Sequence, residues 1–362
     1  MSICLITPAF AGLKNLRRIS CIATAVAALL AGWAGAAQAQ EHVGPCDILG
    51  QARTPCVAAH SMTRALYGRY DGPLYQVRRA DGQVRDIAPL APGGVADAAA
   101  QDAFCAGVIC VVTRIYDQSP QRNDLTIEGA GERAGPDRGA VANALPVMVE
   151  GRRAYGLFIQ AGMGYRDDDT RGVAQNGQPE TMFMVTSGLH VNKGCCFDYG
   201  NAERNNNDTG NGHMDAVNFS LICGERRVCL GSGPWVQADL ENGLFMSARG
   251  GNPNSAYRGN SSPFVTALLK NNGRNFFALK SGDAQRGGLG LIYRGHEPLG
   301  KPGYSPMHQE GAIVLGTGGD NTNQSIGSFF EGVMTAGVTS RQADAAIQAN
   351  IVAARYSGLE AR

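Results

Sequence analysis

From about residue 145 onward, short runs of apolar and β-branched residues alternate with clusters of Gly, Asn, Asp and Ser. Short runs bounded by such turn residues predict the strands of a sandwich or barrel. The composition agrees, because 49 glycines and 17% charged residues suit many tight turns and do not suit long helices. We therefore expect an all-β protein with strands at Arg153–Ile159, Thr181–Ser187, Ala216–Ile222, Pro234–Leu240, Phe264–Leu269, Asn275–Leu279, Gly288–Arg294, Ala312–Gly316 and Ser328–Val333.

The residues before this region predict a mixture of elements. A helix is expected over Cys56–Tyr67, because Thr54 is a good cap and Pro55 suits a first helical turn. Strands and one short helix are expected at Leu74–Arg79, Val108–Tyr116 and Asp97–Phe104.

A helix is also expected near the C-terminal end. Ser340 can cap it and Asp344 falls in its first turn, where a carboxylate is favourable. Ile347 and Ile351 lie four residues apart, so both fall on one apolar face.

Residues 1–39 have the pattern of a secretory signal, with a basic start, the apolar stretch Ile19–Ala34 and the cleavage site Ala37-Gln38-Ala39. The apolar stretch is too short, and too rich in Ala and Gly, to predict a membrane span. We expect cleavage near Ala39, a secreted or periplasmic protein, and one compact domain over residues 40–362.

The charge balance excludes some partners. Residues 1–39 hold three of the 32 basic residues and none of the 31 acidic ones, so their removal changes the formal charge from +1 to −2. No basic stripe is present, and nucleic acid is therefore not an expected partner. The sequence contains no C-x-x-C pair and no H-x-x-x-H spacing, so a zinc site is not expected.

Eight of the ten cysteines follow the signal, and an even number in an exported chain predicts disulfides. Two of them are adjacent, Cys195 and Cys196. A vicinal bridge must depart from the usual 4.4–6.8 Å between bridged Cα atoms. Adjacent cysteines can also begin two separate bridges, and both interpretations stay open on this pattern. The eight form four close pairs, 46/56, 105/110, 195/196 and 223/229.

The segment from Trp235 to Asn242 carries the strongest chemical signal. Alternation along a strand would place Trp235, Gln237, Asp239 and Glu241 on one face, opposite an apolar face. An indole and two carboxylates on one sheet surface suit a sugar-cleaving groove, with a stacking platform and acid/base or nucleophilic groups. The ordinary alternative is a solvated polar face.

A second candidate is Leu315–Asn321, where an apolar strand runs into three glycines and then Asp320. Glycine allows another group to approach the backbone closely, although Gly-Asp-Asn is also common in polar turns. A phosphate-binding loop is disfavoured, since no Gly-Lys-Ser/Thr follows.

The polar loop Asn201–His213 is a weaker candidate. It could hold calcium, but its spacing does not match an EF-hand. His213 is a lone histidine, for which a surface or structural role is expected. No G-x-S-x-G elbow is present, which disfavours serine hydrolase chemistry.

Several segments in one order resemble the catalytic domain of glycoside hydrolase family 54, whose members are α-L-arabinofuranosidases. The resemblance runs from about residue 44 to Tyr356. Its segments are Gly44-Pro45-Cys46-Asp47, Thr54-Pro55-Cys56-Val57-Ala58-Ala59-His60-Ser61, Gly72-Pro73-Leu74-Tyr75-Gln76-Val77, Cys195-Cys196-Phe197-Asp198-Tyr199-Gly200-Asn201, Asp208-Thr209-Gly210-Asn211-Gly212-His213-Met214, Ala238-Asp239-Leu240-Glu241-Asn242-Gly243-Leu244-Phe245 and Gly318-Gly319-Asp320-Asn321.

The resemblance implies a concanavalin-like β-sandwich and hydrolysis with retention of the anomeric configuration. It places the family's nucleophile on Glu241 and its general acid/base on Asp320. Its sugar-contacting positions fall on Asp239, Asn242, Gly319 and the Cys195–Cys196 pair, which in the family is a vicinal disulfide. Family disulfides also fall on Cys46–Cys56 and Cys105–Cys110, and Cys223–Cys229 is a candidate for an additional bridge.

Two departures from the family pattern matter. The family usually carries a C-terminal β-trefoil that binds arabinose side chains, and no such segment follows Tyr356 here, so weaker attachment to insoluble polysaccharide is expected. The stretch Leu221–Gly231 also differs, since the family places a tryptophan near the sugar there. A changed substrate preference, for another furanoside, is one consequence.

The sequence thus predicts a monomeric, exo-acting α-L-arabinofuranosidase that removes terminal arabinofuranose from arabinoxylan or arabinan. No cofactor or metal is expected. The alternatives are a glycosidase for another furanose, such as galactofuranose, and a carbohydrate-binding sandwich without catalysis. The presence of both Glu241 and Asp320 favours an enzyme, because a lectin has no need of that pair.

Overall fold

The computed structural model describes residues 42–224, 228–248, 253–298 and 302–359. Residues Glu41–Arg362 group into one compact unit. The described residues are mainly β-structure with three short helices, α1 (Pro45–Gln51), α2 (Ala98–Phe104) and α3 (Arg341–Ala353). Within them, no helix has the length and apolar character needed to cross a bilayer. The expected all-β class is therefore confirmed.

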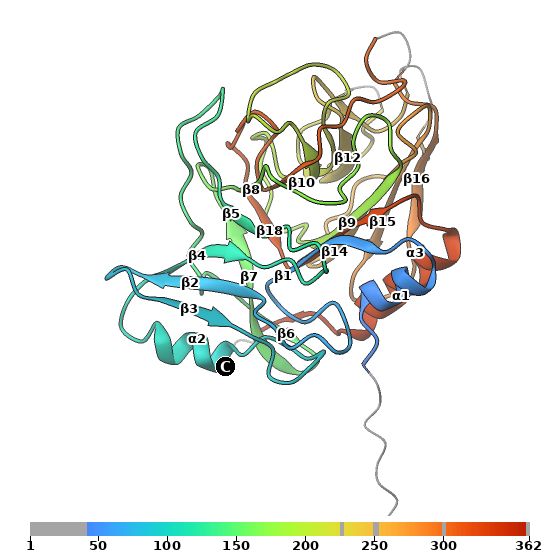
Figure 1. Cartoon of the computed structure of the whole chain (residues 1–362). Helices are drawn as coiled ribbons and strands as arrows, with labels where there is room; N and C mark the ends of the chain where they lie inside the picture. Colours follow the sequence, from blue (N-terminus) through green and yellow to red (C-terminus); the bar gives the residue numbers. More distant parts are fainter. Residues whose placement is uncertain (1–41, 225–227, 249–252, 299–301, 360–362) are drawn as a thin grey trace, which may run out of the picture. The chain divides into compact units, whose positions relative to one another are not determined.

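Three antiparallel sheets contain the strands (Figure 1). The six-stranded sheet has the order β1 (Cys56–Ser61), β19 (Glu331–Ala336), β9 (Glu180–Thr186), β14 (Val265–Asn271), β15 (Phe277–Asp283) and β16 (Gly290–Gly295). The ten-stranded sheet has the order β13 (Leu244–Phe245), β12 (Trp235–Asp239), β11 (Asp215–Ser220), β10 (Asp198–Ala202), β17 (Ala312–Leu315), β8 (Tyr165–Asp167), β5 (Leu125–Ile127), β4 (Cys110–Ile115), β2 (Tyr75–Arg79) and β3 (Val84–Ile87). A four-stranded sheet has the order β18 (Gly327–Phe329), β7 (Arg152–Ile159), β6 (Leu145–Val149) and β20 (Ser357–Gly358).

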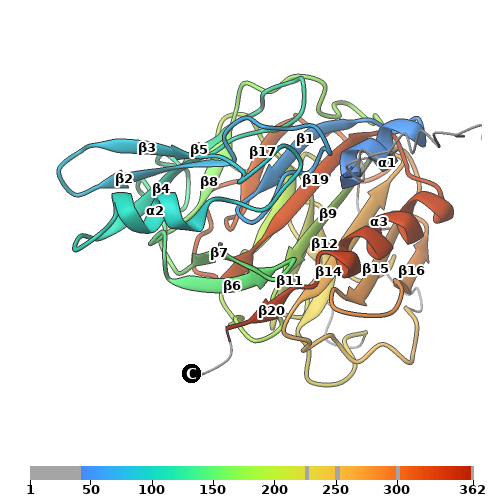
Figure 2. The ribbon, with the colours of Figure 1, turned by 90° about the horizontal axis from the view of Figure 1, so that it is seen from below.

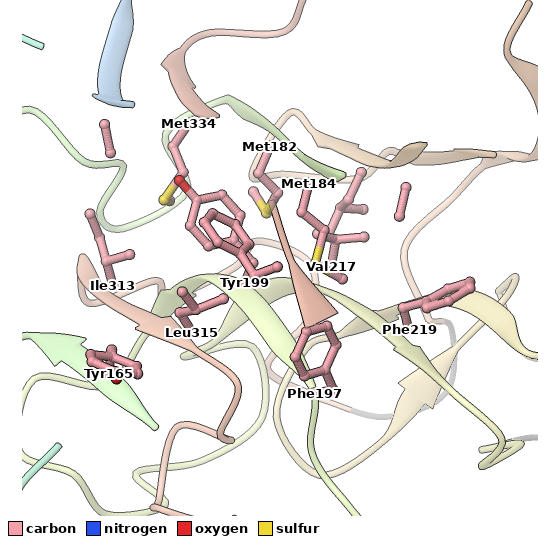
Figure 3. Packing of buried hydrophobic residues seen from close by; sticks show 14 of the residues in the cluster. Tyr165, Met182, Met184, Phe197, Tyr199, Val217, Phe219, Ile313, Leu315 and Met334 are labelled. Carbon is pink, nitrogen blue, oxygen red and sulfur yellow. The ribbon is translucent and has the colours of Figure 1, made fainter. Parts of the chain in front are cut away.

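The main core lies between the six-stranded and ten-stranded sheets. Figure 3 shows Met182 and Met184 of β9 facing Tyr199 of β10 and Val217 and Phe219 of β11, all of them buried. Inward-facing side chains of two sheets that interdigitate in this way are the defining contact of a β-sandwich.

A second core covers the opposite face of the six-stranded sheet. Phe183 and Val185 of β9 point away from the first core and pack in a cluster with Leu49 of α1 and Ile347 of α3. The two helices pack against each other, with α3 beside β14 and β15 and α1 next to β1 (Figure 2). Because both faces of β9 are covered, the strand is buried at every position, and its central residues Met182–Val185 are apolar without alternation.

The predicted strands from residue 153 onward are confirmed, with bounds that move by a few residues. The segment Ser328–Val333 holds two strands, β18 and β19, which belong to different sheets. The two helices expected at Asp97–Phe104 and after Ser340 are also confirmed. Ser340 caps α3, since its side chain accepts a hydrogen bond from the N–H group of Ala343.

The helix predicted over Cys56–Tyr67 is wrong. Residues Cys56–Ser61 form β1, a fully buried strand that pairs with β19. The helix lies ten residues earlier, where Pro45 occupies its first turn and the Asp47 carboxylate accepts a hydrogen bond from the Gly44 N–H group at 2.8 Å. Pairing with a buried neighbour strand outweighs a local cap signal.

Four disulfides join the cysteines in neighbouring pairs. They are Cys46–Cys56, Cys105–Cys110, Cys195–Cys196 and Cys223–Cys229. The first ties α1 to the start of β1, and the second closes the connection between α2 and β4. Residues 225–227, inside the divergent stretch Leu221–Gly231, lie outside the described residues.

A cluster of buried carboxyl groups lies at one end of the main core. Glu180 at the start of β9 and Asp215 at the start of β11 share a hydrogen bond, and Glu297 after β16 is also buried. Burial raises the pKa of Asp215 to about 7 and that of Glu297 to about 9. These carboxyls are therefore neutral in the folded protein at mildly acidic pH.

This cluster predicts that the protein loses stability as the pH rises. A carboxyl with a raised folded-state pKa stabilises the fold fully below its ordinary pKa near 4.5, and this stability is lost as the pH rises through about 9 for Glu297. Glu297→Gln removes that ionisation, so its melting temperature should fall less than that of the wild type between pH 5 and pH 9, by at least ~2 °C. Equal losses in thermal unfolding of the two proteins would contradict this.

Candidate active site

A cavity of about 510 Å³ opens beside the ends of β10 and β12. In Figure 1 these strands lie near the top of the view, above α1 and α3. Val236 and Ala238 of β12 face the core, so Asp239 points to the other face, away from the six-stranded sheet. Every residue predicted from the sequence as nucleophile, acid/base or sugar contact lines this cavity, namely Asp239, Glu241, Asn242, Gly319, Asp320, Cys195 and Cys196.

A tight turn presents Glu241 to the cavity. Strand β12 ends at Asp239, and β13 begins at Leu244 and pairs back onto it. The two central residues of the turn, Glu241 and Asn242, have φ values of 62° and 56°. A hairpin turn of this mirror-image type needs positive φ at both central positions, which normally favours Asn and Gly. A glutamate there carries a conformational cost, and such costs concentrate at functional sites.

Contacts on the backbone hold this turn in place. The Tyr304 hydroxyl donates a hydrogen bond to the Glu241 carbonyl at 2.6 Å, and Tyr304 is fully buried. The Gly212 N–H group donates to the Leu240 carbonyl at 2.8 Å. The Asn242 amide donates to the Asp208 carboxylate at 3.1 Å. The position of Glu241 is therefore set by two separate segments of chain, the loop that holds Asp208 and Gly212 and the segment that holds Tyr304.

The structure corrects the expected surface around β12. Trp235 does not line the cavity; it is buried, and its indole N–H group donates to the Leu230 carbonyl at 2.9 Å. Gln237 is fully buried and hydrogen-bonded to the segment that follows β11. The expected stacking platform is therefore absent from this strand, and the solvated polar face is wrong as well.

The loop that carries Asp320 is tied to the adjacent cysteines. The Cys196 N–H group donates to the Thr322 carbonyl at 2.9 Å, and the Gln324 N–H group donates to the Cys195 carbonyl at 2.8 Å. The Thr322 hydroxyl and N–H group both donate to the Asp320 carboxylate, at 2.6 and 3.0 Å. The Cys195–Cys196 disulfide thus forms a wall of the cavity next to Asp320.

Arg133 approaches Asp320 from a loop far away in the sequence. Its Nε atom lies 2.9 Å from a carboxylate oxygen of Asp320, and its N–H group donates to the Asp320 carbonyl at 3.1 Å. The Arg133 side chain is 57% exposed. An exposed ion pair of this kind is weak, so it can yield to a bound ligand at little cost.

Four carboxyl groups crowd together at the cavity and directly behind it, in two hydrogen-bonded pairs. Asp198 of β10 shares a hydrogen bond with Asp239, and Glu203 shares one with Glu241. Burial raises the pKa of Glu241 to about 7, and the charges of Asp208 and Asp320 add to the rise while the hydrogen bond with Glu203 opposes it. Burial and the charges of its neighbours hold the pKa of Asp239 well above its usual range.

Two groups of described residues bring possible metal ligands within 4.8 Å of one another. In the first, Cys195, Cys196 and Asp239, the sulfur atoms are bonded to each other and are not thiolates. In the second, Glu203, Asp208 and Glu241, the two glutamates are hydrogen-bonded together. We assign a metal to neither group.

Sequence analysis missed the groups behind the cavity. Asp198 and Glu203 lie on or next to β10, whose sequence Asp-Tyr-Gly-Asn-Ala has little strand character. Arg166 of β8 is buried and donates hydrogen bonds to the carbonyls of both Glu203 and Gly319. It therefore ties two walls of the cavity together.

A sandwich with two facing carboxyl-bearing segments at one cavity is the arrangement of a glycoside hydrolase. The family described as "Alpha-L-arabinofuranosidase B, catalytic" matches residues 45–357. The chain belongs to this family.

Relatives and solved structures agree with this assignment. Alpha-L-arabinofuranosidase B of Emericella nidulans is 49% identical over 324 residues, which cover 87% of this chain and 62% of the relative. An alpha-L-arabinofuranosidase of Hypocrea jecorina is 50% identical over 326 residues, with 87% and 63% covered. The chain thus spans less than two thirds of the length of these relatives.

The fold matches two solved structures over 87% of this chain and 66% of theirs. One is an arabinofuranosidase complexed with arabinofuranosyl-α-1,2-xylobiose, with a TM-score of 0.82 and 45% identity. The other is a GH54 α-L-arabinofuranosidase soaked with a cyclic sulfate inhibitor, with a TM-score of 0.82 and 44% identity.

The contact of Tyr304 with the Glu241 turn gives a testable expectation. Tyr304→Phe removes one hydrogen bond that fixes the Glu241 backbone, so turnover of an aryl arabinofuranoside should fall about 3- to 10-fold. Tyr165→Phe is the matched control, because the buried Tyr165 hydroxyl donates to the Val112 carbonyl at 2.9 Å, away from the cavity. Equal kcat losses in the two variants would show that the effect is general destabilisation.

Proposed function

We propose that this protein is an exported, retaining α-L-arabinofuranosidase that removes terminal arabinofuranosyl residues from arabinoxylan or arabinan. The observation that carries the proposal is one cavity lined by both Glu241 and Asp320. Family membership over residues 45–357 supports the substrate class. The similarity to α-L-arabinofuranosidases of Emericella nidulans and Hypocrea jecorina supports it further.

In the first step, the ionised Glu241 carboxylate attacks the anomeric carbon. Asp320 gives its proton to the glycosidic oxygen as the bond to the leaving sugar breaks. The product of this step is a glycosyl ester on Glu241 and a released alcohol. Asp320 is left as a carboxylate, with Arg133 and the Thr322 hydroxyl as its neighbours.

In the second step, the Asp320 carboxylate takes a proton from water as the water oxygen attacks the anomeric carbon. The ester bond breaks and Glu241 leaves as a carboxylate, so both groups return to their starting states. Two inversions at one carbon give net retention. A separation of about 5–5.5 Å between the two carboxyls is the requirement for this route.

The remaining lining residues are proposed to recognise the sugar. Asp239 and Asn242 offer polar groups to sugar hydroxyls, and Gly319 leaves room for the ring because it has no side chain. The Cys195–Cys196 disulfide offers an apolar surface beside Asp320. Asp239 gives its proton to the hydrogen bond with Asp198, so its remaining oxygen lone pairs can accept a hydrogen bond from a sugar hydroxyl.

The compartment and domain organisation are also proposed. Four disulfides favour an oxidising compartment, which agrees with export of the chain and cleavage near Ala39. Residues 1–39 lie outside the described residues. We propose that residues 40–362 form the catalytic domain, acting as a monomer without metal or cofactor.

Two other functions are alternatives to arabinofuranoside hydrolysis. Another furanoside such as galactofuranose could be the substrate, because the cavity wall at Ile222 and Gly224 belongs to the divergent stretch Leu221–Gly231. A carbohydrate-binding protein without catalysis is the second alternative. It does not explain two carboxyl-bearing segments held at one cavity.

Release of 4-nitrophenol distinguishes these functions. The wild type should release it from the α-L-arabinofuranoside faster than from the β-D-galactofuranoside, and Glu241→Gln should lose roughly 10³-fold or more of kcat. Faster release from the galactofuranoside would contradict the substrate assignment. Binding of arabinofuranosyl oligosaccharides without release from either glycoside would favour a lectin.

The disulfide wall predicts a loss of activity larger than the loss of stability. A bridge between neighbours closes no loop, so removing it frees little unfolded-chain entropy. The double variant Cys195→Ala/Cys196→Ala should lose about 10-fold or more in kcat/KM while its melting temperature falls less than that of Cys46→Ala/Cys56→Ala. A large fall in melting temperature with activity kept would overturn the assigned role.

A further inference from the structure

Glu203 is a buried glutamate immediately behind the proposed nucleophile. It follows β10, and its side chain is 0% exposed. Its carboxyl lies directly against Gly319, because a Cβ atom added at Gly319 would stand 1.9 Å from Glu203 Oε2. Position 319 must therefore be glycine, because any larger side chain would overlap the Glu203 carboxyl.

The surroundings of this carboxyl are unusual. Apart from the backbone N–H group of Glu203 itself, no N–H group or hydroxyl among the described residues donates a hydrogen bond to either of its oxygens. The carboxyl oxygens of Glu203, Asp208 and Glu241 lie within 4.8 Å of one another. Two buried carboxyls in such contact can be accommodated if one of them carries a proton and donates it to the other.

From this contact we propose that Glu203 is a positioning residue, which stays protonated and donates a hydrogen bond to the Glu241 carboxylate. The proton lies on Glu203 because Glu203 is the more deeply buried of the two, with Glu241 8% exposed at the cavity. Burial and the charge of Glu241 raise the pKa of Glu203 to about 9, above the value of about 7 for Glu241. This inference rests on the proposed function of Glu241 as nucleophile.

The charged groups around Glu203 are consistent with a neutral carboxyl there. Most of them are acidic and favour the protonated form, whereas Arg166 is engaged with the Glu203 backbone carbonyl and not with its carboxyl. The facing groups are Glu241 and Asp239 from the β12 end, Asp208 from the loop after β10, Glu310 from the segment before β17, and Arg166 from β8.

The hydrogen bond gives Glu241 two properties that the first step needs. It favours the ionised form of Glu241, since a donor to a carboxylate stabilises its charge. It also fixes one carboxylate oxygen, which leaves the other free to reach the anomeric carbon. Glu203 does not line the cavity, so it acts through Glu241 and not on the substrate.

A pair of variants separates hydrogen bonding from packing. Glu203→Gln keeps an isosteric donor, and kcat should stay within about threefold of the wild type, with an unchanged acidic limb of the activity–pH profile. Glu203→Met removes the donor, so kcat should fall about 10- to 100-fold at little change in KM. Its acidic limb should move up by about one pH unit, because Glu241 then binds its proton more tightly.

Glu297→Gln is the matched control for burial. Glu297 has a raised pKa of about 9 and is fully buried, but it lies outside the cavity, so its variant should keep the wild-type pH profile. Equal damage from Gln and Met at position 203, or an acidic limb that does not move in Glu203→Met, overturns the proposal. So does loss of wild-type activity on chelation that calcium restores, since a cation would then occupy this gap.

A spectroscopic measurement keeps this proposal separate from the proposed function. The infrared difference spectrum of wild type minus Glu203→Gln at pH 7 should contain the carbonyl band of a protonated carboxyl. If no arabinofuranoside is hydrolysed but the band is present, the proposed function fails and the protonation of Glu203 stands. If hydrolysis occurs and the band is absent, the Glu203 proposal fails alone.

Discussion

The carboxyl groups of Asp198, Glu203, Asp239 and Glu241 are too deeply buried, and too close together, for all four to be ionised. Each is at least nine-tenths buried, and burial raises the pKa of every one of them. One shared proton within each pair relieves the repulsion between the carboxylate charges. It also fixes which carboxyl oxygen of the pair donates a hydrogen bond and which accepts it. The chemistry at this cavity depends on where those protons lie.

The fold makes this crowding possible. The ten-stranded sheet has one face on the main core, which leaves its other face to carry the carboxyls of β10 and β12. The β12–β13 turn then places Glu241 above Glu203 and Asp239. Gly319 completes the floor, because it permits the Asp320 loop to lie directly over the Glu203 carboxyl.

Asp320 sits in a different electrostatic environment. It accepts two hydrogen bonds from Thr322 and forms an ion pair with Arg133. Retaining hydrolysis needs the carboxylate form of Asp320 in the second step and the protonated form in the first. Because the Arg133 side chain is 57% exposed, this ion pair is weak and leaves the Asp320 carboxylate accessible from the cavity.

The part of the site that could be predicted is the part carried by short local patterns. Asp239 and Glu241 stand near a strand end, and Asp320 follows an apolar strand and glycines, so their chemistry is visible in sequence. The strand–turn–strand geometry that presents Glu241 was not predicted, because a Glu-Asn pair at positive φ is an unusual turn choice. The all-β fold class was predictable in the same way, because short apolar runs separated by turn residues are also a local pattern.

The missed features depend on contacts between distant segments. Strand β10 has weak strand character but is buried in the middle of the sheet between β11 and β17, where pairing decides its conformation. Arg133 meets Asp320 across 187 residues of sequence. The Cys56–Tyr67 helix prediction failed because pairing of β1 with β19 overrode a local cap.

The most direct test of the account is to identify the residue that becomes covalently attached to the sugar. The protein should be treated with an arabinofuranose-configured cyclic sulfate, digested, and analysed by mass spectrometry. We expect a single adduct on the peptide containing Glu241, lost in Glu241→Gln. An adduct on Asp320, or arabinofuranoside hydrolysis with inversion and no adduct, would contradict the account.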